Sequence, residues 1–107
     1  MIEVKAVIRP NKLPVLRTAL LEIPGFPGMT VTKVEGCSAP SKINKTNIKE
    51  ELTDYSAKVR VEIVCNDEIS EVIMNRIVTI CQTGQIGDGV VWCTEVPKAF
   101  FISKTSS

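Results

Sequence analysis

A chain of 107 residues, 44% of them hydrophobic and 23% charged, has the size and composition of one folded domain and not of a disordered segment. Thirteen basic and twelve acidic residues leave a net charge of +1, which excludes the global positive field of a general nucleic-acid binder. No apolar run approaches the ~20 residues of a membrane span, and no secretion signal is evident. We therefore expect a single domain over residues 1–107 that is soluble and cytoplasmic.

The N-terminal third predicts a strand, a helix and a second strand. Residues 1–9 alternate apolar and polar side chains, which is typical of a strand with one buried face. From Pro10 the apolar residues are spaced for one face of a helix, in which Pro14 is tolerated only within the first turn. The proline- and glycine-rich stretch 24–28 ends this helix, and the β-branched residues of 30–36 predict the second strand.

Residues 37–55 lose all apolar periodicity and carry mixed charges and turn-forming residues. The stretch is longer than the roughly 12–15 residues beyond which loops in compact domains are uncommon and tend to be functional or disordered. We predict a long loop between the second and third strands. Composition alone leaves open whether it is functional or a tolerated insertion.

The remaining chain predicts two strands separated by a helix, followed by a short terminal strand. Residues 56–65 alternate as a third strand, and Asn66 suits the N-cap of a second helix that Gly84 would end. Residues 90–96 are apolar enough for a fourth strand, and residues 99–102 for a short fifth one.

This order, β-α-β-β-α-β with a small extra strand, is the ferredoxin-like α+β arrangement. Two helices cover only one face of such a sheet. The third and fourth strands nevertheless contain runs that are apolar almost throughout, at 63–65 and 90–93, which predicts burial on both faces. We expect a second subunit to cover the other face, and residues 103–107 to form a disordered tail.

The sequence contains few residues suited to catalysis or to metal binding. The chain has no histidine, so the commonest general base and the commonest metal ligand are both missing. Its four cysteines, Cys37, Cys65, Cys81 and Cys93, form no CxxC pair, and we interpret them mainly as buried reduced thiols. Cys37, at the edge of the long loop, is the exception. We expect no enzymatic activity and no resident metal.

Three glycines lie within residues 84–89, between the second helix and the fourth strand. Glycines allow positive φ angles and close approach to a ligand, and successive amides in such a turn can form an anion-binding nest. A helix end followed by an Asp-Gly turn gives the same composition for structural reasons alone. On physical grounds the phosphate cradle and the structural turn are equally favoured.

The run 83–89, Thr-Gly-Gln-Ile-Gly-Asp-Gly, closely resembles the Thr-Gly-x-Ile-Gly-Asp-Gly motif of the nitrogen-regulatory PII signal-transduction family. Residues 6–13, 28–36 and 59–64 resemble that family's first strand and helix start, second strand and third strand. The resemblance covers the chain except the loop and the tail. It implies a homotrimer of ferredoxin-like subunits with adenine nucleotides in the clefts between them, no obligatory cofactor, and a long T-loop, here 37–55, that contacts partner proteins.

Carried over residue by residue, the resemblance implies a set of ligand-binding positions on the sheet, at the loop base and in the glycine turn. They are Val7, Thr30, Gly36, Cys37, Lys58, Val64, Gly87, Asp88, Gly89, Val90, Phe101 and Ser103. Val7, Thr30 and Val64 match positions near adenine and ribose. Residues 87–89 match the phosphate-side turn, and Lys58 matches a lysine that helps to hold 2-oxoglutarate.

Several positions depart from the family pattern. A lysine and two arginines that grip the phosphates in typical members are replaced here by Val90, Phe101 and Ser103. Charge-assisted contacts of this kind contribute on the order of 1.5–3 kcal/mol each, so a triphosphate should bind weakly unless Lys98 or Lys104 substitutes.

The loop departs as well. Pro40 replaces the loop-base glutamine that helps to hold Mg²⁺ and 2-oxoglutarate, and an acidic residue near Glu51 replaces the tyrosine that some bacteria modify. We therefore expect neither ATP–2-oxoglutarate sensing nor uridylylation.

The leading hypothesis is a divergent PII-like regulator that senses ADP, AMP, cyclic AMP or a small anion such as bicarbonate. Through its long loop it would regulate a membrane transporter or a metabolic enzyme, and such a partner would bring it to the membrane.

Two alternatives belong to other classes. One is a trimeric metal-responsive protein that resembles CutA and uses Cys37 with loop carboxylates such as Glu50, Glu51 or Asp54. The other is RNA binding on the sheet, which is disfavoured because the central strands offer a single aromatic side chain. Those strands present Val59, Val61, Val90 and Trp92.

Overall fold

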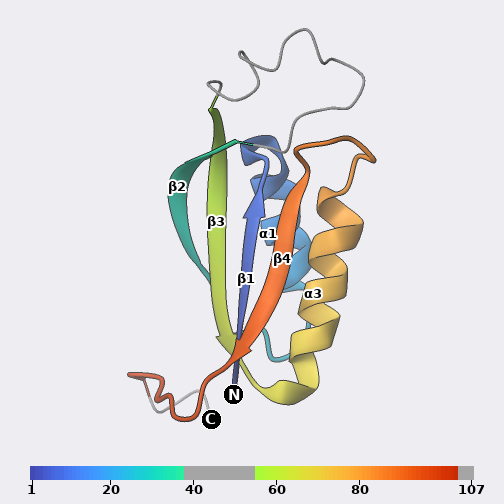
Figure 1. The fold of residues 1–107 in the computed structure, drawn as a ribbon. Coiled ribbons are helices and arrows are strands. Elements are labelled where there is room, and N and C mark those ends of the chain that lie inside the picture. The colour runs from blue at the N-terminus through green and yellow to red at the C-terminus, as the bar shows by residue number, and fades with distance from the viewer. Residues whose placement is uncertain (38–54, 104–107) are drawn as a thin grey trace, which may run out of the picture.

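The computed structural model describes residues 1–37 and 55–103, and the predicted features at 38–54 and 104–107 lie outside these ranges. The elements are β1 (Ile2–Ile8), the 3-10 turn η1 (Pro10–Lys12), α1 (Leu13–Leu21), β2 (Thr30–Gly36), β3 (Ser56–Cys65), α3 (Asp67–Cys81) and β4 (Gly89–Glu95). The strands pair antiparallel in the order β2-β3-β1-β4, and both helices lie on the same side of the sheet (Figure 1). The predicted ferredoxin-like order is confirmed.

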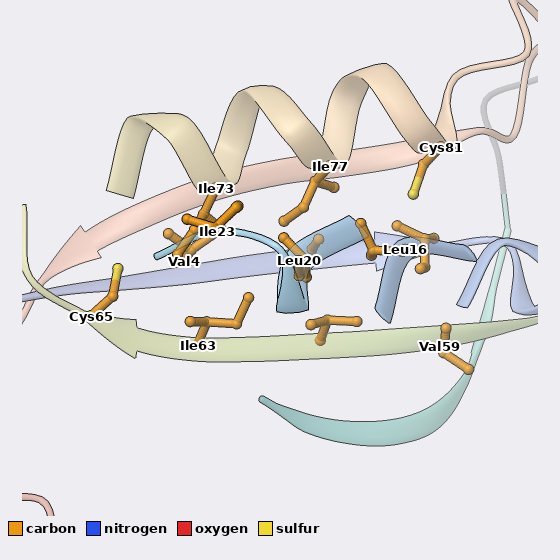
Figure 2. Packing of buried hydrophobic residues seen from close by; sticks show 13 residues of the cluster. Val4, Leu16, Leu20, Ile23, Val59, Ile63, Cys65, Ile73, Ile77 and Cys81 are labelled. Carbon is orange, nitrogen blue, oxygen red and sulfur yellow. The ribbon is translucent and has the colours of Figure 1, made fainter. Parts of the chain in front are cut away.

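The core lies between the sheet and the two helices (Figure 2). It is built from alternate residues of the two central strands and from one stripe of each helix. Its members are Val4, Ala6, Ile8, Leu16, Leu20, Ile23, Val59, Val61, Ile63, Cys65, Ile73, Ile77 and Cys81. Burying one Leu, Ile or Val side chain contributes about 1.5–3 kcal/mol, so this single layer accounts for most of the favourable free energy of folding within the chain.

The first helix begins as the prolines require. Pro10 opens the 3-10 turn, and Pro14 lies in the first turn of α1, where its missing N–H leaves no helical hydrogen bond unmade. The helix ends at Leu21, earlier than the apolar spacing suggested. Ile23 still joins the core because the following turn, closed by a 3.0 Å hydrogen bond from Ile23 N–H to the Leu20 carbonyl, directs it inward.

The second helix differs from its prediction at both ends. Asn66 is the N-cap residue, but its side chain makes no capping hydrogen bond, and the first turn carries Asp67 and Glu68, whose charges suit the helix dipole. The helix ends at Cys81 because Gln82 is already extended, with ψ 139°. Gly84 has a φ of +80° but lies beyond the helix end, so it shapes the turn and does not stop the helix.

The predicted short strand at 99–102 is absent from the structure. Pro97, two residues after the end of β4, has no N–H to continue the ladder, so the chain leaves the sheet before it reaches this segment. The segment instead runs beside residues 27–30, with Phe100 and Ile102 exposed.

The face of the sheet opposite the helices is not buried by the parts of the chain that the structure describes. Val64 is half-buried and Val90 is exposed, so the prediction that both faces are covered is not met within one chain. Charged side chains on this face pair along their own strands, Lys5 with Glu3 at 3.2 Å and Arg60 with Glu62 at 3.9 Å. Charged side chains therefore share this face with Val64 and Val90.

Trp92 lies on the same open face and is in contact with a cation. The guanidinium of Arg60 lies 5.8 Å from the centre of the Trp92 ring, within the range of a cation–π interaction. The one aromatic side chain of the described strands therefore already packs against Arg60 instead of being free to stack on a base. This further disfavours the RNA-binding alternative.

Two of the four thiols are buried. Burial raises the pKa of Cys65 and Cys81 above the ordinary thiol value, which makes both less reactive. Cys93 is exposed, contrary to expectation, because β4 is an edge strand that the helices cover only in part. Neither helix of the described chain is long and apolar enough to cross a bilayer.

Candidate functional site

The carboxylate of Asp88 organises the glycine-rich turn between α3 and β4. Its Oδ2 accepts hydrogen bonds from the backbone N–H of Thr83, at 2.6 Å, and of Gly84, at 3.0 Å. Its Oδ1 accepts from the Thr83 hydroxyl and from Arg9 Nε, the latter at 3.2 Å. Four donors thus converge on one carboxylate and close the turn around it.

These contacts hold the pKa of Asp88 far below the usual aspartate range. The hydroxyl of Thr83 is the largest cause, followed by its backbone N–H, with smaller effects from Arg9 and Gly84. Asp88 is consequently an anion at any physiological pH.

Two cations brace the other side of the turn. Arg9, which follows β1, donates from its guanidinium to the Ile86 carbonyl at 3.0 Å as well as to Asp88. Lys58, from β3, donates Nζ–H to the Gly87 carbonyl at 2.6 Å. The turn is therefore fastened to β1 and β3 by side chains that are far from it in sequence.

Lys58 is unusual because only 7% of it is exposed. Burial lowers its pKa, the charge of Arg9 lowers it further, and Asp88 opposes both effects. The three side chains together carry a single net positive charge, so an anion that approaches the turn meets a modest local attraction.

The glycines of the turn have different roles. Gly87 and Gly89 have φ angles of +96° and +113°, which disfavour any other residue. A Cβ on Gly89 would lie 1.8 Å from the Val7 carbonyl oxygen, because β4 begins directly against β1. The structural interpretation of the motif is thus correct for Gly89, and it leaves a ligand role for the turn open.

The predicted site residues form two groups at opposite ends of the sheet. The first group surrounds the turn: Val7 pairs with Val90 across β1 and β4, and a Cβ on Gly36 would touch Lys58 Cγ at 3.3 Å. Val90 is 58% exposed beside this group, and Cys37 is exposed directly after β2.

The second group lies at the other end, near the start of β2. Thr30, Val64 and Phe101 line one pocket, together with Glu62. Val64 and Lys58 occupy the same face of β3 six positions apart, which corresponds to about 20 Å. In Figure 1 the turn after α3 and the C-terminal segment accordingly lie at opposite ends of the sheet. One chain does not bring the twelve residues together, and Ser103 is exposed beyond both groups.

Comparison with known proteins decides the family. A family model described as nitrogen regulatory protein P-II matches residues 1–106. The chain is 36% identical over 103 residues to the nitrogen regulatory protein P-II of Klebsiella oxytoca and to P-II 1 of Escherichia coli K12, covering 94% of this chain and 89% of each relative. It is 39% identical over 97 residues to GlnK2 of Haloferax mediterranei, covering 90% of this chain and 78% of that protein.

The chain belongs to the nitrogen regulatory protein P-II family. It is a PII-type signal-transduction regulator, and the resemblance noted around residues 83–89 is confirmed. The described residues of this P-II protein contain no group of three or more side chains able to hold a metal ion. Glu50, Glu51 and Asp54 of the metal-binding alternative lie outside the described residues, so this finding does not bear on them.

Two residues important to the turn of this P-II protein were not among the predicted site positions. Thr83 was noticed only as part of the motif, although a hydroxyl five positions before Asp88 in a glycine-rich turn is a recognisable local signal. Arg9 has no such signal, because 79 positions separate it from Asp88 and only the pairing of β1 with β4 brings the two together.

The titration of Asp88 provides a direct check of the turn. Its pKa is depressed in the folded state, so its interactions stabilise the protein above the unfolded pKa near 3.9 and lose that effect as the pH falls further. We expect carboxyl NMR titration to give a midpoint below that of a model peptide. Thr83→Val, which removes the largest cause while keeping side-chain volume, should raise the midpoint. An unshifted midpoint in the parent protein would show that the turn is not closed in solution.

Proposed function

We propose that this P-II protein senses a small effector in clefts between the subunits of a homotrimer and regulates a membrane transporter or metabolic enzyme through residues 37–55. The effector is an adenine nucleotide with fewer phosphates than ATP, such as ADP, AMP or cyclic AMP, or a small anion such as bicarbonate. The observation that carries the proposal is a glycine turn held in shape by Asp88, Arg9 and Lys58, next to positions that lack the cations of a phosphate clamp.

The turn is arranged before any ligand arrives. Both oxygens of Asp88 are saturated by donors, and the Ile86 and Gly87 carbonyls are occupied by Arg9 and Lys58. A ligand that binds here spends little free energy on ordering the backbone, which favours even a weakly charged effector.

The charge available near the turn argues against a triphosphate. Val90 is exposed where a cation would have to reach a phosphate, and Phe101 lines an apolar and acidic pocket. Arg9 and Lys58 are already engaged with acceptors of the turn itself. With one net positive charge in the cluster, one or two phosphates, or a bicarbonate ion, match the site better than three.

The separation of the two groups supports a site between subunits. The turn lies at one end of the sheet, and the pocket of Thr30 and Val64 lies about 20 Å away at the other end. A second copy, packed on the uncovered face of the sheet, is the simplest means of placing one chain's turn beside another chain's pocket. The same packing would bury Val64 and Val90.

A short path connects the turn to the base of the long loop. Gly87 contacts Lys58, Lys58 packs against Gly36, and the loop begins directly after Gly36. A ligand that draws Lys58 Nζ away from the Gly87 carbonyl would change the support of the loop base. We propose this exchange as the step that couples effector binding to the loop.

Isothermal titration of the parent protein and of Val90→Lys with ATP, ADP, AMP, cyclic AMP and bicarbonate tests the proposal. We expect the parent protein to bind AMP, ADP, cyclic AMP or bicarbonate at least as tightly as ATP. In Val90→Lys one charge-assisted contact, about 1.5–3 kcal/mol, should raise ATP affinity roughly tenfold or more relative to AMP. Absence of heat with all five compounds, or a strong preference of the parent protein for ATP, would overturn the proposal.

A further inference from the structure

We propose that Phe101 is a specificity-determining residue that stacks on the base of the effector, so that binding depends mainly on the base and little on the phosphates. The inference rests on the proposed function, because it assigns the base-binding part of the same site. The inference starts from the pocket at the beginning of β2, which is lined by an aromatic ring, an aliphatic side chain and two carboxylates.

Phe101 is the more enclosed of the two aromatic side chains in the apolar segment 99–102. It is 43% exposed, compared with 77% for Phe100, while Ile102 is fully exposed. It lines both the pocket with Thr30 and Val64 and the neighbouring pocket with Phe26 and Cys65. Its ring therefore stands between two hollows and is accessible to a planar ligand.

The charges of the pocket define the chemical class of ligand. Glu3 and Glu62 line it, and no lysine or arginine does. Glu3 is paired with Lys5 and Glu62 with Arg60, yet each carboxylate retains a second oxygen that can accept a hydrogen bond. Because Lys5 and Arg60 are engaged with these carboxylates, the pocket offers a phosphate no free cation, while the remaining carboxylate oxygens suit N–H donors on a flat ring.

Together these features fit an amino-substituted heteroaromatic ring such as a purine base. Val64 supplies an apolar contact, Phe101 a π face, and the carboxylates acceptors for the ring's N–H groups. The phosphate end of the ligand has to lie elsewhere, at the glycine turn of the assembled protein. Stacking of one base on an aromatic ring corresponds to a roughly five- to 150-fold change in affinity, or about 1–3 kcal/mol.

The experiment measures dissociation constants of AMP, adenosine and ribose 5-phosphate by isothermal titration for the parent protein and three variants. Phe101→Ala removes the ring, Phe101→Leu keeps apolar volume without a π face, and Phe101→Trp enlarges the π face. We expect AMP affinity to fall about five- to 150-fold in the first two variants and to persist in the third. Adenosine should bind the parent protein within about tenfold of AMP, and ribose 5-phosphate should not bind.

Leu21→Ala is the control, since Leu21 is an exposed apolar side chain of α1 that does not line this pocket. It should leave AMP affinity unchanged, and thermal midpoints show that all variants fold. If the parent protein binds AMP equally well with Ala, Leu or Trp at position 101, or binds ribose 5-phosphate but not adenosine, the inference is wrong while the proposed function stands. If the parent protein binds no nucleotide or bicarbonate at all, the proposed function fails, and the inference fails with it.

Discussion

Gly89→Ala is expected to destabilise the protein by on the order of 2–6 kcal/mol, which combines strain at a φ of +113° with a steric clash. The added Cβ would lie 1.8 Å from the Val7 carbonyl oxygen and 2.9 Å from the Val7 carbonyl carbon, both of them backbone atoms that no side-chain rotation can move away. The start of β4 would have to separate from β1. Urea denaturation at fixed protein concentration measures the loss.

Gly25→Ala is the matched control for this change. Gly25 also has a positive φ, +82°, but nothing lies within 4 Å of the position its Cβ would occupy. Only the left-handed backbone is then penalised, by about 1–2 kcal/mol. Equal losses in the two variants would mean that β4 does not approach β1 as closely as described.

Asp88→Ala is expected to release the turn while leaving the core intact. The Thr83 and Gly84 amides lose their acceptor, so their hydrogen exchange should accelerate toward that of an unstructured peptide, while core amides stay protected. If binding then has to order even one residue of backbone, at about 1–2 kcal/mol, effector affinity falls about five- to thirtyfold. Amide exchange by NMR and titration with AMP measure the two effects.

Asp67→Ala is the control, because Asp67 is an exposed carboxylate at the start of α3 whose partner is the N-terminal amino group. It should leave the Thr83 and Gly84 amides protected. Asp88→Asn should have an intermediate effect, since it keeps one acceptor oxygen but turns an NH₂ group toward the donors. Unchanged protection of both amides in Asp88→Ala would show that the carboxylate does not hold the turn.

Both results bear on the proposal that this regulator recognises a nucleotide with few phosphate-binding cations. A turn that Asp88, Arg9 and Lys58 already hold needs little ordering on binding. In the proposed site, a base that stacks on Phe101 would supply contact area where cations are missing. The two features are complementary. Gly89 joins the turn to the sheet, because β4 begins at Gly89 directly against β1.

The order of elements could be predicted because hydrophobic periodicity is local. Period-two alternation at 1–9 and 56–65 and helical spacing after Pro10 and Asn66 all correspond to faces that are buried in the structure. Errors appeared where the local pattern does not decide burial. Cys93 is exposed because it lies on an edge strand, and the apolar segment 99–102 does not form a strand.

The sequence by itself determined the fold class, the glycine turn and, through the motif at 83–89, the family, because these depend on neighbours along the chain. Only the tertiary structure decided which groups hold the turn. Arg9 and Lys58 reach it across 77 and 29 positions, through a strand register that no local pattern records. The tertiary structure also decided which of the other predicted site positions lie at each end of the sheet, since the pairing of β1 with β4 places Val7 beside Val90, and the course of the C-terminal segment places Phe101 in one pocket with Thr30 and Val64.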